Sequence, residues 1–299
     1  MSKPTVIFVC GPTASGKTAW AIQIAQHLNT VILSADSRQC YRELNIGVAR
    51  PSPQELEAVP HYFIASHSVT DELNAAWYEE YALKTAMEVF KSHPYLVVVG
   101  GTGLYINAFR DGLDAIPPIE PAIREEIRNA YAQRGMEWLR EAVKQADPVY
   151  FETGETENPQ RMMRALEVAK STGKSIRSFQ TSQTAERPFN SISIAPDWPR
   201  DILYDRINTR VDQMVDAGLE GEVRSLLPFK HLNALQTVGY SEFFDYFDGK
   251  ISREEAIEKI KQHTRQYAKR QLTWFRRDAS VRWIQPDQAG RVPEILNIN

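Results

Sequence analysis

A phosphate-binding motif near the N-terminus constrains the fold of this chain more than any other stretch. Residues 11–18 complete the pattern G-x-x-x-x-G-K-[ST]. An apolar run over 5–10 precedes the motif and an amphipathic stretch over 19–28 follows it, which is the strand–loop–helix context that such a loop requires. Backbone N–H groups of the loop and the positive end of the following helix attract anions. The motif therefore predicts a polyphosphate site in an α/β fold.

The side chains of this motif predict how the anion is held. Lys17 adds a full positive charge, and Thr18 can place its hydroxyl on a Mg²⁺ ion. Mg²⁺ is therefore the expected cofactor, with Thr18 as its expected protein ligand. The expected diphosphate-binding residues are Gly11, Pro12, Thr13, Ala14, Ser15, Gly16, Lys17 and Thr18. The motif identifies the class of ligand and leaves the reaction open.

The composition is that of an ordinary globular protein. The 299 residues exceed the usual size of one domain, and 42% are hydrophobic and 24% charged. The net charge of −3 gives no overall nucleic-acid signal, so a nucleic-acid partner would need local basic patches. Two cysteines form no disulfide framework, no stretch is long enough to span a membrane, and the N-terminal apolar run is too short for a signal peptide. We therefore expect a cytoplasmic protein with no membrane partner.

Apolar runs that alternate with helical periodicity predict a mostly parallel sheet. Beyond the first strand, strands are expected over 31–35, 61–65, 95–100 and 191–195. From residue 114 the composition changes, and the following segment reads as successive short helices without a strand signal. We therefore predict a P-loop NTPase-like α/β core over 1–114 and 187–299, which includes C-terminal basic helices, and a helical insertion domain over 115–186.

Two strand ends carry the residues that bear on the chemistry. Asp36 follows the second expected strand, where open α/β sheets bind ligands, so it can abstract a proton or hold the metal indirectly; a turn or helix cap is the alternative. P-loop enzymes that transfer phosphoryl groups commonly have an acidic residue after the strand that corresponds to 95–100. Gly100 and Gly101 stand there instead. With Thr102, these glycines predict an open site for a bulky group beside the phosphates.

Basic residues recur at helical spacing in three places. Arg161 and Arg164 share a helix face, which is either a solvated face or a contact surface. Arg206 and Arg210 lie one turn apart, so they can clamp a diphosphate or pair with acidic residues of the same helix. The long expected helix over 252–277 combines lysines and arginines with aromatic residues. Such a helix fits a nucleic-acid backbone, and it also fits an ordinary surface position.

Eight motifs in order resemble the tRNA dimethylallyltransferases, also called tRNA isopentenyltransferases. They cover residues 11–18, 36–41, 46–51, 100–105, 158–161 with 164–168, 206–211, 235–240, and 264–271 with 273–276. A phosphate loop alone is shared by many enzymes, whereas this ordered set is specific. The third motif differs from the family's usual Ile-Gly-Thr-Ala-Lys-Pro at Val48 and Arg50, where Arg50 keeps the charge but exchanges an ammonium for a planar guanidinium.

The resemblance implies transfer of the dimethylallyl group of dimethylallyl diphosphate to the exocyclic N6 amine of the adenosine immediately 3′ of the anticodon in tRNA. The phosphate loop would then hold the leaving group, so the missing acid at the strand end is not needed. Lys17, Thr18 and Arg210 would act on the departing diphosphate. Asp36 would accept the proton of the attacking amine. The implied partners are the tRNA anticodon stem-loop and dimethylallyl diphosphate, and a monomer is expected.

The resemblance also implies tRNA contacts in both parts of the chain. The residues that follow Asp36, together with Thr102, would orient the adenine, which must be flipped out of its stack. Arginines of the helical insertion and of the final helix would hold tRNA phosphates. The expected tRNA-contacting residues are Asp36, Ser37, Arg38, Gln39, Thr102, Arg124, Gln160, Arg161, Met162, Met163 and Arg164.

Three other functions use part of the same pattern. A small-molecule kinase of the P-loop class would use Lys17 and Thr18 equally well, but it leaves the insertion and the basic final helix without a role. An adenylate isopentenyltransferase would keep the chemistry and use a free nucleotide as acceptor. A non-catalytic RNA-binding module would leave the phosphate loop and Asp36 unused. ATP turnover, the choice of acceptor and prenyl transfer by the purified protein distinguish these functions.

Overall fold

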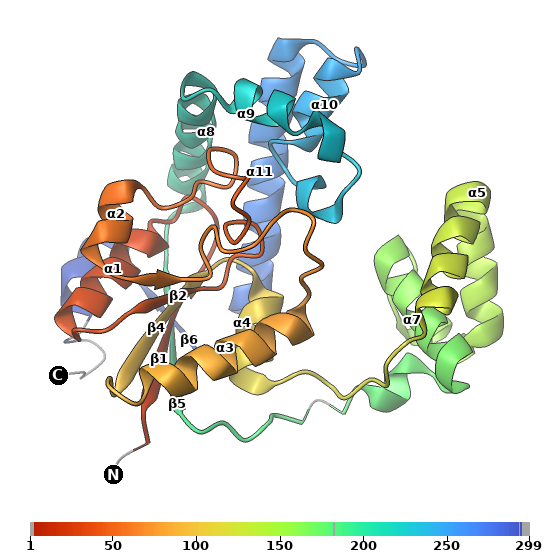
Figure 1. Ribbon diagram of the computed structural model, residues 1–299, viewed down its shortest axis with the longest axis horizontal. Coiled ribbons are helices and arrows are strands. Elements are labelled where there is room, and N and C mark those ends of the chain that lie inside the picture. Colours follow the sequence, from red (N-terminus) through yellow and green to blue (C-terminus); the bar gives the residue numbers. More distant parts are fainter. Residues whose placement is uncertain (1–2, 182, 293, 295–299) are drawn as a thin grey trace. The chain divides into compact units, whose positions relative to one another are not determined.

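A parallel sheet forms the larger of two units in the computed structural model, which describes residues 3–181, 183–292 and 294 (Figure 1). Within these residues the sheet has six strands in the order β3-β2-β4-β1-β5-β6. They are β1 (Thr5–Cys10), β2 (Ile32–Ser34), β3 (His61–Tyr62), β4 (Tyr95–Gly100), β5 (Asn190–Pro196) and β6 (Val281–Ile284). The predicted parallel α/β fold of the P-loop type is confirmed.

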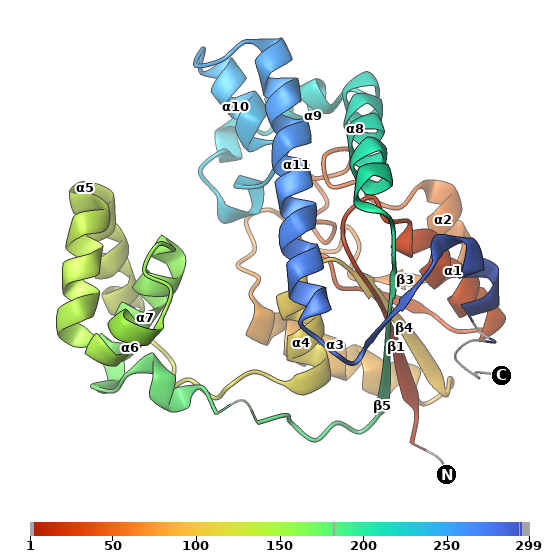
Figure 2. The ribbon, with the colours of Figure 1, turned by 180° about the vertical axis from the view of Figure 1, so that it is seen from behind.

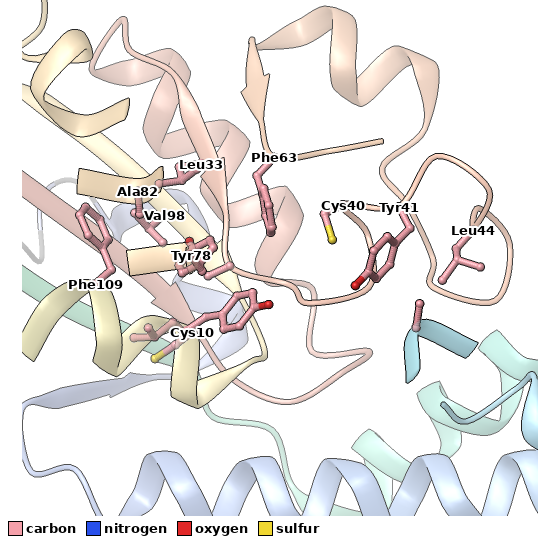
Figure 3. Close-up of a cluster of buried hydrophobic side chains, with 14 of the residues drawn as sticks. Cys10, Leu33, Cys40, Tyr41, Leu44, Phe63, Tyr78, Ala82, Val98 and Phe109 are labelled. Carbon is pink, nitrogen blue, oxygen red and sulfur yellow. The ribbon is translucent and has the colours of Figure 1, made fainter. Parts of the chain in front are cut away.

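Strands β1 and β4 lie inside the sheet and are buried on both faces, which explains their continuous apolar sequences. Along β1, Phe8 faces a core that includes Tyr78 and Phe109, while Val9 faces a second core on the opposite side. Figure 3 shows part of the first core, where Cys10 lies as a buried thiol. The register pairs Cys10 with Gly100. The loops that follow β1 and β4 therefore leave the sheet side by side at its carboxyl edge.

Helices cover both faces of this sheet. The first core is closed by residues of α3 (Ala75–Val89) and α4 (Gly103–Asp111), and the second by α1 (Lys17–His27). The larger unit also contains α8 (Arg200–Asp216), α9 (Leu219–Ser225), α10 (Ser241–Phe247), α11 (Arg253–Arg276) and the shorter helix α2 (Pro53–Ala58). Figure 2 shows α8 and α11 side by side. Both reach the site through residues described below.

The smaller unit, Asp111–Ala185, is helical throughout its regular structure. It contains α5 (Pro121–Ala146), α6 (Pro148–Thr153), α7 (Pro159–Thr172) and the 3₁₀ turn η1 (Ile176–Phe179). Gly135 has a φ of 72° and interrupts α5, so two helical segments meet at this residue. Ile127, Leu139 and Leu166 belong to a separate hydrophobic core of this unit. In the described part of the chain, no helix has the length and apolar character needed to cross a membrane.

Candidate active site

A cavity of about 710 Å³ lies at the carboxyl edge of the sheet in the larger unit. Its wall combines the phosphate loop, the segment that begins at Asp36, the loop over 47–51, and one side each of α8 and α11. Polar lining residues include Lys17, Thr18, Asp36, Gln39, Arg206, Arg210, Tyr267 and Gln271. The position is where open parallel sheets bind ligands, because the loops after the strands converge there. The structure therefore brings together the predicted diphosphate residues and Asp36.

The phosphate loop has the backbone that an anion site needs. Gly11, Ala14 and Gly16 have positive φ values of 133°, 61° and 84°, which turn the loop back on itself. Gly16 directly precedes α1, and no side chain caps the first turn of that helix. The unpaired N–H groups and positive end of α1 consequently face the loop, where they stabilise negative charge.

Lys17 is partly buried, and its ammonium lies against the phosphate loop. Its ammonium donates a hydrogen bond of 3.0 Å to the carbonyl of Pro12. Burial, reinforced by the nearby Arg210 guanidinium, lowers the pKa of Lys17 to about 8, and Asp36 partly opposes that shift. A bound diphosphate supplies negative charge beside this ammonium and favours its protonated form.

Two arginines of α8 reach the phosphate loop. Arg210 donates a hydrogen bond of 3.2 Å to the hydroxyl of Thr13, and burial lowers its pKa. Arg206 donates to the carbonyl of Ala14 at 2.9 Å and lies 4.5 Å above the ring centre of Trp198. The helix therefore turns both cations toward the loop. The alternative use of Arg206 and Arg210, in ion pairs along their own helix, does not occur among the described residues.

Other side chains hold the outer edge of the same loop. The indole N–H of Trp198 donates to the carbonyl of Ser15 at 2.8 Å. The side-chain carbonyl of Gln271, on α11, accepts a hydrogen bond of 2.8 Å from the backbone N–H of Thr13. No role for Trp198 or Gln271 was predicted, because both residues are far from the loop in sequence. Only the tertiary fold brings them to it.

Asp36 lies at the cavity and also shapes its own turn. Its Oδ1 atom accepts hydrogen bonds from the backbone N–H groups of Arg38 at 2.9 Å and Gln39 at 3.2 Å. The turn role that the sequence left open is therefore present. The carboxylate partly opposes the lowering of the pKa values of Lys17 and Arg210, because its charge favours the protonated form of both cations.

Thr102 and Ser37 connect the loops that follow β4 and β2. The hydroxyl of Thr102 accepts a hydrogen bond of 3.0 Å from the Ser37 backbone N–H and lies 3.3 Å from the Ser37 hydroxyl. The amide group of Gln39 is used differently, because its Nε2 donates to the carbonyls of Val48 at 3.2 Å and Ala49 at 2.9 Å. The nitrogen of Gln39 thus supports the loop over 47–51.

The glycines at the end of β4 are in close contact with neighbouring segments, and Gly100 also lines the cavity beside the phosphate loop. A Cβ atom on Gly100 would lie 2.2 Å from the backbone oxygen of Ala35. On Gly101 it would lie 2.2 Å from Nε2 of Gln271, and on Gly103 it would lie 2.2 Å from the indole nitrogen of Trp274. The missing side chains admit neighbouring backbone and two α11 side chains, so the segment is tightly packed.

The loop over 45–50 is fixed by residues that the sequence analysis did not identify. The Glu222 carboxylate accepts hydrogen bonds from three successive backbone N–H groups, at 3.2 Å from Asn45, 2.7 Å from Ile46 and 3.1 Å from Gly47. The Tyr240 hydroxyl also donates to Glu222, at 2.5 Å. An isolated glutamate on a short helix gives no sequence signal for this role.

Arg50, one of the two departures from the family motif, supports this loop. Its guanidinium donates to the backbone carbonyls of Tyr41 at 2.9 Å, Arg42 at 3.0 Å and Leu44. All three contacts come from one nitrogen, Nη2, so they use one end of the planar guanidinium. Arg50 therefore contributes to the shape of the cavity wall as well as to its charge.

The predicted tRNA contacts of the insertion lie on α5 and α7 of the smaller unit. Arg161 forms an ion pair of 2.5 Å with Glu155, and Arg164 forms one of 3.2 Å with Glu167. The Arg124 guanidinium lies 3.8 Å from the same Glu167 carboxylate. These arginine side chains are partly exposed, and Gln160 is also exposed. Surface ion pairs are weak, so an RNA phosphate can compete for these cations.

Met162 and Met163 were expected to contact tRNA, and burial contradicts that expectation for their side chains. Met162 is fully buried and Met163 is 8% exposed, and both belong to the hydrophobic core of the smaller unit. They occupy the apolar face of the amphipathic helix α7, opposite its arginines. Their contribution is to the packing that holds the helix.

The residues around the cavity fit a Mg²⁺ ion bound together with a phosphate ligand. Among the described residues, no group of three or more His, Cys, Asp or Glu side chains forms a metal cluster. Mg²⁺ does not require such a cluster, because it keeps several waters and is commonly held by one or two protein oxygens and substrate phosphates. The Thr18 hydroxyl and the Asp36 carboxylate both line the cavity and offer suitable oxygen atoms.

Comparisons with known proteins agree with this site. The family model described as IPP transferase matches residues 39–278. The chain is 46% identical to the tRNA dimethylallyltransferase of Cytophaga hutchinsonii over 97% of this chain and 94% of that protein. It is 43% identical to tRNA dimethylallyltransferase 1 of Bacteroides thetaiotaomicron over 99% of this chain and 96% of that protein.

Solved structures of similar proteins cover nearly the whole chain. The full-length tRNA isopentenylpyrophosphate transferase from Bacillus halodurans matches with a TM-score of 0.72 and 33% identity, over 99% of this chain and 96% of that one. A eukaryotic dimethylallyltransferase acting on tRNA shares the fold, with a TM-score of 0.81 and 22% identity over 99% of this chain and 80% of that one. The family resemblance inferred from the eight motifs is confirmed: the chain belongs to the IPP transferase family.

Proposed function

We propose that this chain is a tRNA dimethylallyltransferase. It transfers the dimethylallyl group of dimethylallyl diphosphate to the N6 amine of the adenosine immediately 3′ of the anticodon and releases diphosphate. Family membership supports the reaction, since relatives that match over nearly their full length carry this name. The observation that carries the proposal is the presence of Asp36 and the phosphate loop in one cavity.

The phosphate loop stabilises the leaving group. As the bond between the allylic carbon and the diphosphate oxygen breaks, the electron pair stays on the diphosphate. Lys17, Arg210 and the backbone N–H groups at the start of α1 neutralise the charge that develops there. These donors are already held in place by the loop, so little reorganisation is needed during the reaction.

Asp36 accepts the proton that the acceptor amine loses. The N6 nitrogen of adenosine forms the new bond to the allylic carbon and loses a proton, which the Asp36 carboxylate accepts. Thr102 and Ser37, which are hydrogen-bonded to each other, offer hydroxyl groups next to Asp36 that can orient the flipped-out base. The atoms balance, because the tRNA gains the dimethylallyl group and the diphosphate and one proton are released.

The cation that we propose for this reaction is Mg²⁺. Thr18 would hold it, together with oxygens of the diphosphate. When bound, the ion supplies additional positive charge to the leaving group. The chain's own contribution remains the placement of Lys17 and Arg210 around the same group.

The tRNA is proposed to contact both units. In the larger unit it would reach Asp36, which lines the cavity, and Ser37 and Thr102, which are hydrogen-bonded to each other. In the smaller unit Gln160, Arg161, Arg164 and Arg124 would bind its phosphates. We place the enzyme in the cytoplasm as a monomer. Its two cysteines are free thiols, which is usual for proteins of reducing compartments.

A comparison of acceptors tests the proposal. The purified chain is incubated with labelled dimethylallyl diphosphate, Mg²⁺ and either AMP or an anticodon stem-loop. We expect label in the stem-loop and none in AMP. The reason is that Arg161 and Arg164 can bind the phosphates of a polynucleotide backbone, which AMP lacks. Efficient labelling of AMP would instead identify a free-nucleotide acceptor, and ATP-dependent phosphorylation of a small acceptor would identify a kinase.

A further inference from the structure

One buried amide side chain links the two loops that converge on the cavity. Gln271, on α11, is 6% exposed. Its Oε1 atom accepts a hydrogen bond of 2.8 Å from the backbone N–H of Thr13, in the phosphate loop. Its Nε2 atom donates a hydrogen bond of 2.8 Å to the backbone carbonyl of Gly101, in the loop after β4. A single side chain thus spans the ends of two neighbouring strands.

The chemistry of this bridge is specific to an amide. One contact needs an acceptor and the other needs a donor, and a carboxamide provides both at one end of a side chain. A glutamate could serve the Thr13 N–H but would repel the carbonyl of Gly101. A hydrophobic residue would leave both backbone groups without this partner in a buried place, which is costly.

Gly101 provides a second, independent observation. A Cβ atom at this position would lie 2.2 Å from Nε2 of Gln271 and 3.4 Å from the backbone oxygen of Gly11. Gly101 does not have a positive φ, so its backbone conformation does not itself require glycine. The space required by the Gln271 amide is therefore a physical reason for glycine at position 101.

Three side chains hold the backbone of the phosphate loop in place. The Thr13 N–H is occupied by Gln271, while the carbonyls of Ala14 and Ser15 are occupied by Arg206 and Trp198. With these groups already paired, the other backbone N–H groups of the loop are left for the anion. Tyr267, one turn before Gln271 on α11, lines the cavity.

We propose that Gln271 is a positioning residue for the diphosphate. It fixes the phosphate loop against the loop that carries Thr102, so that the leaving group and the attacking amine meet in the required geometry. This inference rests on the proposed function for its catalytic consequence. Its direct consequence, a phosphate loop preorganised for diphosphate, concerns binding alone.

A double-mutant cycle between Gly101→Ala and Gln271→Ala tests the proposal. The affinity for inorganic diphosphate with Mg²⁺ is measured by calorimetry for the wild type, both single variants and the double variant. We expect each single variant to bind about tenfold more weakly, and Gly101→Ala to have no more than about a twofold effect once Gln271 is shortened, because contacting residues are not additive. Additive losses, or unchanged affinity in both single variants, would overturn the proposal.

Gln271→Met, which approximately conserves the side-chain volume, separates positioning from folding. Thermal melting checks that this variant is folded. We expect a lower kcat and a higher KM for dimethylallyl diphosphate, with the KM for tRNA within about twofold of wild type. A general folding defect would instead change the KM values for both substrates together. If the two KM values rose equally, Gln271 would have only a structural role. Absence of prenyl transfer by the wild type would refute the proposed function and leave the diphosphate cycle interpretable.

Discussion

Asp36 has two roles, and truncating its side chain would remove both at once. Its Oδ1 atom holds the turn over residues 36–39 by accepting two backbone hydrogen bonds, and its charge acts on Lys17 and Arg210 across the cavity. Replacement by alanine removes the turn contacts as well as the proposed base. An isosteric amide keeps an oxygen for the turn and loses the capacity to accept a proton.

Asp36→Asn is therefore the informative substitution. We expect the single-turnover rate of prenyl transfer to fall by about 10²- to 10⁴-fold, which is the usual contribution of a general base. The affinity for an anticodon stem-loop, measured by filter binding, should stay within about twofold of wild type, because the turn is retained. Transfer at the wild-type rate would show that Asp36 is not the base.

The lowered pKa of Lys17 predicts an alkaline limit. In the free enzyme the ammonium loses its proton as the pH rises through about 8, so kcat/KM for dimethylallyl diphosphate should fall above that value. The kcat should fall only at higher pH, because bound diphosphate raises the pKa of Lys17 in the complex. A pH profile of both parameters checks this, and a kcat/KM that stays level to about pH 9.5 would contradict it.

At the level of elements, local signals predicted much of the core. The helices α1 and α11 were expected from their apolar spacing or composition, and β1 and β4 from continuous apolar runs. Pro51, Pro53 and Pro60 favour a loop over the segment that contains the helix α2. The structure begins this helix at Pro53 with a capping box, in which Ser52 and Glu55 satisfy each other's backbone N–H groups. The capping signal was present but was outweighed by the prolines.

Two strands show the limits of local reasoning. The edge strand β6 follows the long helix α11 and has only four residues, with Arg282 exposed, so it was not predicted. The strand β3 was expected over 61–65 and is limited to His61–Tyr62, where it pairs with β2. Short edge strands depend on pairing with neighbours, and pairing is a tertiary property.

The candidate site likewise contains residues that local sequence predicts and residues that only the tertiary fold brings there. The phosphate loop and Asp36 were found because they belong to contiguous motifs. Glu222 and Gln271 were missed because each acts on a loop at least 170 residues away in sequence. The close contacts at Gly100 and Gly101 were not predicted for the same reason, since the residues that make them come from other parts of the chain.

Glu222 predicts how one cavity wall is stabilised. Glu222→Ala removes the acceptor of three successive backbone N–H groups, and hydrogen bonds to a charged acceptor contribute about 1.5–3 kcal/mol. We expect faster amide hydrogen exchange over residues 45–47 and a higher KM. Glu220→Ala is the matched control on the same helix, because Glu220 pairs with Arg224 and Arg253 near the surface. Equal exchange in both variants would contradict the anchoring role.

At the scale of the whole molecule, the residues that we propose for the reaction and for tRNA binding belong to two units. The larger unit contains the phosphate loop, Asp36 and the cavity. The smaller unit carries partly exposed arginines on helices that pack around their own core. The net charge of −3 gave no sign of an RNA partner. Local placement of cations is sufficient for such a partner, because RNA contacts depend on nearby charges more than on the total.

Mass spectrometry of an anticodon stem-loop tests the central claim most directly. The stem-loop is incubated with the protein, dimethylallyl diphosphate and Mg²⁺, and fragments are assigned to individual nucleosides. The account predicts that one dimethylallyl group is added, on the adenosine immediately 3′ of the anticodon. A matched stem-loop in which this nucleoside lacks the N6 amine should stay unmodified. An unchanged adenosine mass in the first stem-loop, or equal modification of the second, would contradict transfer to that amine.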